Sequence, residues 1–119
     1  RNIFEWSFEL GWDLENGGLY AFCDALKKPT TMLESNMKLW WPINESMITS
    51  LLLLRTSMQN GEGDRKQVSK DWNMVQLVCK YALNALSDRK RDSGKGGWYG
   101  YLRVDSTPEL TIKGGPYKG

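Results

Sequence analysis

The chain has 119 residues, of which 40% are hydrophobic and six are tryptophan, and this fits one globular domain rather than a disordered segment. Lysine and arginine number 16 against 14 acidic residues, for a net charge of +2, and the basic residues form no long stripe. This balance argues against a nucleic-acid-binding protein and against binding to an anionic membrane. Thr49 and Ser50 interrupt the longest apolar run, so we expect no membrane-spanning helix.

Cys23 and Cys79 lie in unrelated contexts and lack the spacing of metal ligands. We therefore expect reduced thiols, no metal site and a cytoplasmic location. No signal peptide is recognisable. The chain starts at Arg1 without a methionine, in what looks like the middle of a helix, so we expect it to be part of a longer protein.

The first ten residues are typical of the last turns of a helix that ends near Gly11. The turn-forming stretch Trp12-Asp-Leu-Glu-Asn-Gly-Gly18 comes next, and Leu19-Tyr-Ala-Phe-Cys23 then alternates as a short strand does. This part of the chain predicts a small hairpin with a strand near residues 18–23. The expected helical face consists of Ile3, Phe4, Ser7, Phe8 and Gly11.

The stretch Met37-Lys-Leu-Trp-Trp-Pro-Ile-Asn-Glu45 joins a tryptophan pair to a proline and a carboxylate. Proline is tolerated in the first helical turn, so Pro42 predicts the start of a helix near residues 42–58. On that helix Glu45 shares a face with Trp41 and with aliphatic residues. It is either a site residue or a first-turn glutamate that suits the helix dipole, and spacing alone favours the second interpretation.

A second helix is expected near residues 66–87, where Asp64 and Gln67 have the form of a capping box. The run from Met47 to Leu54 is apolar nearly all round, which predicts a helix covered on both sides. We therefore expect an inner and an outer helix, packed antiparallel. The apolar stripe predicted for the outer helix is Val68, Trp72, Val75, Cys79, Ala82 and Leu86.

The end of the chain repeats its beginning, because Gly96-Gly-Trp-Tyr-Gly-Tyr-Leu-Arg-Val-Asp105 echoes Gly17-Gly-Leu-Tyr-Ala-Phe-Cys-Asp24. The second copy predicts a strand near residues 98–104. A unit of two helices and a hairpin that recurs at long period indicates a helical toroid with its hairpins on one rim. A single unit of this kind cannot cover its own inner face.

Several blocks of the chain, in their order and approximate spacing, resemble the family of N-acylglucosamine 2-epimerase, also called renin-binding protein. The resemblance covers the whole chain. Its blocks are Trp12-Asp, Asn16-Gly-Gly-Leu-Tyr20, Lys28-Pro-Thr-Thr31, Met37-Lys-Leu-Trp-Trp-Pro42 with Glu45, Gly97-Trp-Tyr-Gly-Tyr-Leu102 and Ile112-Lys-Gly-Gly-Pro-Tyr-Lys-Gly119.

The resemblance implies an all-α fold in which residues 1–119 form the C-terminal portion of an (α/α)6 barrel, with short β-hairpins on one rim. It implies an isomerase that interconverts N-acetylglucosamine and N-acetylmannosamine, on the route to and from sialic acid. No cofactor is expected to be required, and ATP or another nucleotide is expected as an effector in some members. Homodimers and, from the family's second name, renin are the implied protein partners.

The implied chemistry removes the proton on C2 of the open-chain sugar and returns one on the other face, so acid/base groups must flank C2. The chain has no histidine, and the family's catalytic histidines would lie outside residues 1–119. By resemblance Glu45 is the catalytic candidate, Trp40 and Trp41 form an apolar wall, and Lys38 is a substrate-binding candidate. We expect Glu45 to face a cleft lined by Trp40 or Trp41, and we expect this chain alone to be inactive.

The chain departs from the family at Ile43, where histidine usually follows Trp-Trp-Pro, and an aliphatic residue there would remove a polar contact with substrate. Two alternatives to an epimerase therefore stay open: a binding protein with a decayed site, and another sugar-active enzyme on the same toroid. The residue pattern by itself favours a surface cation for Lys38, which we keep as a binding candidate. The aspartates beside the hairpins are better explained as turn formers than as site residues; they are Asp13, Asp24 and Asp105.

Overall fold

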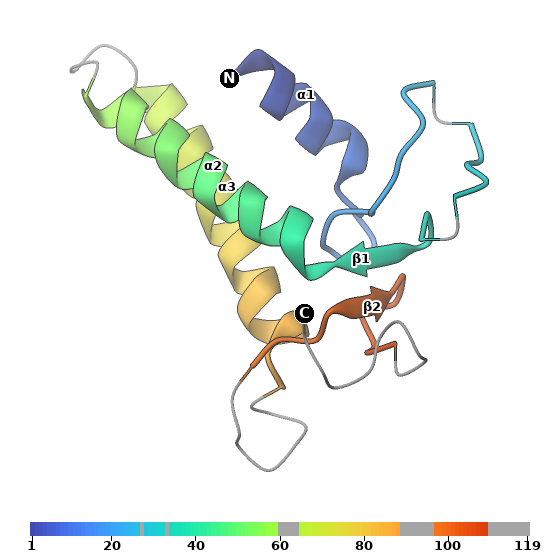
Figure 1. The fold of residues 1–119 in the computed structure, drawn as a ribbon. Helices are drawn as coiled ribbons and strands as arrows, with labels where there is room; N and C mark the ends of the chain where they lie inside the picture. The colour runs from blue at the N-terminus through green and yellow to red at the C-terminus, as the bar shows by residue number, and fades with distance from the viewer. Residues whose placement is uncertain (27, 33, 60–64, 89–96, 110–119) are drawn as a thin grey trace.

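A computed structural model describes residues 1–26, 28–32, 34–59, 65–88 and 97–109 of the chain. It is mainly helical, with a two-stranded sheet at one end of the helices (Figure 1). The elements in chain order are α1 (Asn2–Gly11), β1 (Met37–Leu39), α2 (Trp40–Gln59), α3 (Arg65–Tyr81), a turn of π-helix η2 (Ala82–Leu86) and β2 (Tyr101–Arg103).

The antiparallel pair of α2 and α3 forms the long axis of the fold, and the two helices run side by side in Figure 1. Three serines of α2 are buried, namely Ser46, Ser50 and Ser57. Ser46 and Ser50 donate their hydroxyl hydrogens to carbonyl oxygens four and three residues earlier, whereas Ser57 donates to the Asp71 carboxylate of α3 and accepts from Arg1, so each buried hydroxyl group has a partner. Small, satisfied side chains on this face allow α3 to approach closely. Both helices predicted from periodicity are confirmed, with α2 beginning two residues earlier than expected.

The hydrophobic core lies where α1, the α2–α3 pair and the hairpin end meet. Ile43, Val78, Ala82, Leu86 and Leu102 have no exposed surface. Burying an aliphatic side chain of this size contributes roughly 1.5–3 kcal/mol, which makes this cluster the main source of stability. Its remaining buried members are Phe8, Leu19, Met74, Tyr81 and Tyr99, with Phe4, Trp12, Trp40, Met47, Ala85 and Trp98 packed against them.

The sheet joins the two halves of the chain. Strand β1 pairs antiparallel with β2, so that Met37 faces Arg103 and Leu39 faces Tyr101. The strand predicted near residues 18–23 is reduced to one bridge, Leu19 to Trp12. The strand predicted near residues 98–104 is shorter than expected, and the partner strand at 37–39 was missed, because a three-residue strand paired across two helices has no local alternation to reveal it.

Two tight hairpins flank this sheet at the same end of the helices (Figure 1). In the first, Asp13 N–H donates to Gly18 O at 2.8 Å, and Tyr20 N–H donates to Gly11 O at 3.0 Å. In the second, Leu102 bridges Pro108. The expectation of hairpins gathered at one end therefore agrees with the described residues, whereas a closed barrel lies beyond what this chain contains.

One side of α2 lies uncovered, which agrees with the expectation that a single unit of this kind cannot cover its own inner face. The second covering layer that the apolar run predicts is absent among the described residues. Ile48, Leu51, Leu52 and Met58 are all roughly half exposed or more. The outer stripe is also displaced from its predicted position, because Trp72 is 50% exposed and the buried face of α3 is instead Asp71, Met74, Val75, Val78 and Tyr81. The described helices include none long and apolar enough to cross a membrane. The expected capping residue Asp64 and the closing stretch 112–119 fall outside the described residues.

Candidate active site at the start of α2

The hairpin end is tied together by Lys38, which projects from β1 and is fully buried. Its Nζ lies 2.7 Å from Asp13 Oδ2 and donates to Val104 O at 2.6 Å, with Ser106 Oγ at 3.5 Å. The ammonium also lies 5.6 Å from the ring centre of Tyr20, within the range of a cation–π interaction. Lys38 thus links both hairpins to the sheet.

Asp13 occupies the matching position in the first hairpin and is almost completely buried. Its Oδ1 accepts the backbone N–H groups of Glu15 at 2.9 Å and Asn16 at 3.1 Å, so the predicted turn-forming role of this aspartate is confirmed. Burial raises the pKa of Asp13, but the hydrogen bonds from Lys38, Asn16 and Glu15 outweigh it and hold the pKa well below its ordinary value. The carboxylate is therefore ionised and paired at neutral pH.

These contacts place Lys38 at the hairpin junction rather than at a free surface, so its interpretation as a surface cation is wrong. Its ammonium contacts Asp13, Val104 and Ser106, which belong to the two hairpins. A direct contact between Lys38 and substrate stays a prediction, and the geometry gives the residue a positioning role: it fixes β1, from which the tryptophan pair continues.

The two tryptophans after β1 lie in different environments. The backbone N–H of Trp40 donates to Gly100 O at 3.2 Å, and the Trp40 side chain packs against the core cluster. Trp41 is 51% exposed and lies on the side of α2 that faces the end of α1. Of the pair, Trp41 is therefore the one whose indole is available to line a site.

A hollow of about 260 Å³ separates the start of α2 from α1, and Glu45 and Trp41 line it together. Glu45 is solvent-exposed there rather than enclosed. Phe4 and Phe8 supply apolar surface from α1, and Ser46 and Thr49 supply hydroxyl groups, although Ser46 donates to Pro42 O at 2.8 Å. The hollow thus combines one carboxylate, an indole face and hydroxyl groups, which suits a polar molecule with an apolar face.

Ile43 does not face this hollow. Its side chain has no exposed surface and belongs to the core cluster together with Phe8, Met74 and Val78. An aliphatic residue at this position packs the α2–α3 interface, so in this chain the expectation that Ile43 removes a polar contact with substrate is not supported by its position. The departure from the family pattern at Ile43 is accommodated by the core.

The structure places Glu45 and Trp41 together at the hollow. Trp40 packs against the core, and Lys38 lies in the hairpin junction. The partnership of Lys38 with Asp13 was missed, because a strand residue and a turn residue 25 positions apart share no periodicity. Among the described residues there is no group of three histidine, cysteine or acidic side chains that could hold a metal ion.

The architecture defines a class: mainly helical proteins with an antiparallel helix pair and short hairpins at one end, where the candidate site lies. The chain matches the family model "N-acylglucosamine 2-epimerase (GlcNAc 2-epimerase)" over residues 1–118. It therefore belongs to this family.

Curated relatives agree with this assignment. The chain is 43% identical over 112 residues to the N-acylglucosamine 2-epimerase of Rattus norvegicus and, at the same identity and length, to that of Mus musculus. It is 39% identical over 115 residues to that of Homo sapiens. Each match covers 94% of this chain but only 23–24% of the relative. The chain thus spans about a quarter of the length of the curated relatives it matches.

Proposed function

We propose that this chain forms one wall of the active site of an N-acylglucosamine 2-epimerase, and that residues 1–119 are the C-terminal portion of an (α/α)6 barrel. The observation that carries the proposal is the shared hollow of Glu45 and Trp41 at the start of α2, in a chain of this family. In this proposal the complete enzyme interconverts N-acetylglucosamine and N-acetylmannosamine.

The reaction requires ring opening to the aldehyde, removal of the proton on C2 to give an enolic intermediate, and return of a proton to the opposite face of C2. A carboxylate beside the intermediate can transfer one of these protons, or can accept hydrogen bonds from the sugar hydroxyl groups. Glu45 takes this role. Trp41 provides a flat apolar wall for the sugar ring, while the second acid/base group comes from residues outside this chain, which contains no histidine.

The uncovered side of α2 supports the barrel proposal. Ile48, Leu52 and Met58 continue along α2 from the hollow, and exposed apolar surface of this extent is uncommon on a finished monomeric domain. Neighbouring helix pairs of a toroid would cover this side of α2 and would deepen the hollow into a cleft. We therefore propose that residues 1–119 alone do not epimerise N-acylhexosamines and that they self-associate.

The test uses the complete protein that carries these residues, with Glu45→Gln as the variant and Glu9→Gln, an exposed carboxylate on α1, as the matched control. Conversion of N-acetylmannosamine is measured together with uptake of deuterium at C2 from heavy water. Glu45→Gln is expected to lower kcat by at least about 100-fold, the lower end for loss of a general acid/base, and Glu9→Gln to leave kcat unchanged. Equal turnover by the two variants would remove Glu45 from the chemistry.

The same assay separates the alternatives. A binding protein with a decayed site predicts no deuterium uptake even in the unmodified protein. Another sugar-active enzyme on the same toroid, such as a glycoside hydrolase, requires two carboxylates across the cleft. Within the described residues Glu45 is the one carboxylate that lines the hollow, so this chain alone does not supply such a pair.

The remaining proposals follow from family membership. We propose that the complete protein needs no cofactor, that ATP or another nucleotide acts on it as an effector, and that it is a cytoplasmic homodimer. Renin is proposed as a protein partner from the family's second name alone. Neither nucleic acid nor a membrane is proposed as a partner, since the near-neutral charge favours neither.

A further inference from the structure

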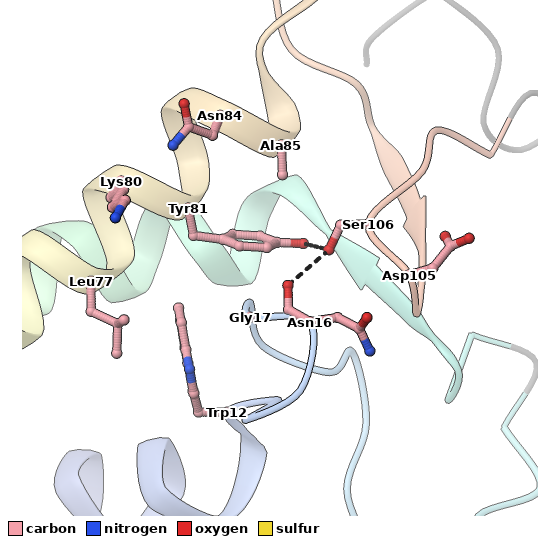
Figure 2. A pocket seen from close by; sticks show the side chains of 10 residues that line it. All are labelled: Trp12, Asn16, Gly17, Leu77, Lys80, Tyr81, Asn84, Ala85, Asp105 and Ser106. Atoms are coloured by element: carbon pink, nitrogen blue, oxygen red, sulfur yellow. Dashed lines mark hydrogen bonds between the residues drawn. The ribbon is translucent and has the colours of Figure 1, made fainter.

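A second hollow, of about 410 Å³, lies between the first hairpin, the end of α3 and the turn after β2 (Figure 2). It shares no lining residue with the hollow of Glu45 and Trp41. Its volume lies within the range of small-molecule sites in proteins. The lining residues are Trp12, Asn16, Gly17, Leu77, Lys80, Tyr81, Asn84, Ala85, Asp105 and Ser106.

Two aromatic side chains give this hollow a rigid wall. The rings of Trp12 and Tyr81 meet edge to face, with centres 5.9 Å apart and planes at 75°. Phe8 stacks on the other side of Trp12 at 5.0 Å and holds the indole in place. Leu77 adds apolar surface from α3. A ligand with one apolar face would therefore meet a surface already in its final shape, and binding would require little further ordering of side chains.

A chain of hydroxyl groups closes one edge of the hollow. Tyr81 Oη and Ser106 Oγ are 2.9 Å apart, and Ser106 Oγ donates to Asn16 O at 3.3 Å, as the dashed lines of Figure 2 show. Burial raises the pKa of Tyr81 to about 12, so the phenol keeps its proton at neutral pH. Because Ser106 donates its hydrogen to Asn16 O, Tyr81 donates to Ser106, and both hydroxyl oxygens can accept hydrogen bonds from the hydroxyl groups of a ligand.

Ser106 occupies a backbone conformation that a serine rarely adopts. Its φ is 65°, in the left-handed region, where glycine or asparagine would be less strained. Strain of this kind costs on the order of 1–3 kcal/mol and clusters at binding sites. The hydroxyl of Ser106, which touches Tyr81, Asn16 and Lys38, is what a glycine at this position would lack.

The charges of the lining balance. Lys80 and Asp105 contribute one charge of each sign, and Asn16 and Asn84 contribute neutral amides. An anion would meet a single lysine opposed by a carboxylate, and a purely apolar ligand would leave the amide and hydroxyl groups without water. A ligand with hydroxyl groups around an apolar-faced ring fits both the aromatic wall and the polar edge.

We propose that this hollow is a second ligand site, distinct from the candidate active site, for a neutral monosaccharide in its closed-ring form. The proposal does not rest on the proposed function, since it depends on the aromatic wall, the hydroxyl chain and the charge balance alone. Occupancy there would involve no chemistry on the sugar, because the hollow holds the ring by stacking and by hydrogen bonds.

The experiment uses the complete protein that carries these residues, labelled with ¹⁵N at tryptophan, and methyl β-D-glucopyranoside as the probe. This glycoside cannot open its ring, so the proposed epimerisation cannot consume it. The indole N–H signal of Trp12, identified from the Trp12→Phe variant, is followed as the probe is added. We expect a saturable shift of that signal, and the Glu45→Gln variant should show the same shift.

Two variants are designed to fill the hollow: Lys80→Trp and Leu77→Trp, both at partly or fully exposed positions of α3. Asn73→Trp, exposed on the same helix and outside the lining, is the matched control. Each filling variant should weaken binding of the probe at least tenfold, while the control binds as the unmodified chain does. The absence of a saturable Trp12 shift, or equal affinity in filling and control variants, overturns the proposal.

Discussion

The hairpin end and the opposite end of the helices are each fastened by a buried aspartate paired with a cation, but the two pairs differ in their access to water. At the hairpin end Lys38 and Asp13 have side chains that are 0% and 3% exposed. At the other end Arg1 pairs with Asp71 at 2.8 Å, and while the aspartate side chain is fully buried, 28% of the Arg1 side chain is exposed.

The partners of the two aspartates differ as well. Asp71 accepts hydrogen bonds from Arg1 through both oxygens, and Ser57 and Gln67 also donate to it. Asp13 accepts hydrogen bonds from Lys38, from two backbone N–H groups of its own turn and from the Asn16 side chain at 3.3 Å. Both aspartates keep other donors when their cation is removed, but water can reach the position vacated by Arg1, whereas the position vacated by Lys38 is closed to water. The hairpin end, which positions the start of α2, should therefore be the less tolerant of the two.

The largest effect is expected from Lys38→Met, which removes the charge and keeps most of the side-chain volume. Breaking a buried ion pair by deleting one partner costs about 3–5 kcal/mol of unfolding free energy, because the other charge stays buried and unpaired. Urea unfolding at pH 7 measures the loss. Adding Asp13→Asn to Lys38→Met should restore part of that loss, because it removes the carboxylate that was left without a counter-charge. The double variant should therefore lose less unfolding free energy than the two single variants lose together. Independent, additive losses would show that the pair is not coupled.

A somewhat smaller effect is expected from Gly18→Ala, in the first hairpin. Gly18 has a φ of 83°, and an added Cβ would lie 2.4 Å from the Tyr81 ring. Backbone strain and overpacking together should lower the unfolding free energy by about 2–4 kcal/mol. The control is Gly100→Ala, whose Cβ would make an ordinary contact of 3.9 Å with Trp40 and should change stability by less than about 0.5 kcal/mol. A tolerated alanine at Gly18 would mean that the hairpin can move away from Tyr81.

The smallest effect is expected at the opposite end, from Arg1→Met. Ser57 and Gln67 remain on Asp71, and water reaches the vacated position, so the loss should be about 1–3 kcal/mol. Arg55→Met, at an exposed position of α2, serves as the control and should be near neutral. A loss as large as that of Lys38→Met would erase the distinction between the two ends.

The loss of unfolding free energy caused by Arg1→Met should also depend on pH. Burial raises the pKa of Asp71, but hydrogen bonds from Arg1, Ser57 and Gln67 lower it further than burial raises it. Since the folded pKa lies below the unfolded one, this pairing contributes its full stability above the ordinary pKa of about 3.9 and loses it as the pH falls through the lower folded value. The difference between Arg1→Met and the unmodified chain should accordingly shrink as the pH falls below about 4.

The sequence by itself determined the elements whose signals are local. The 3.6-residue period located α2 and α3 because each is long enough to repeat its pattern, and Pro42 placed the start of α2 to within two residues. The aspartates and glycines of the first hairpin specified its turn, since Asx side chains and positive φ act within a few residues. The blocks of the whole chain, taken in their order and approximate spacing, identified the family.

Only the tertiary structure decided which of these side chains face one another. The pairing of β1 with β2, the burial of Lys38 against Asp13 and the separation of Trp40 from Trp41 depend on contacts between segments far apart in the chain. Trp72 and Ile43 are both apolar residues of helices, yet Trp72 is half exposed and Ile43 is fully buried. A helical pattern identifies apolar positions but does not say which of them a neighbouring element covers. Burial is a property of the packed pair, whereas periodicity is a property of one helix.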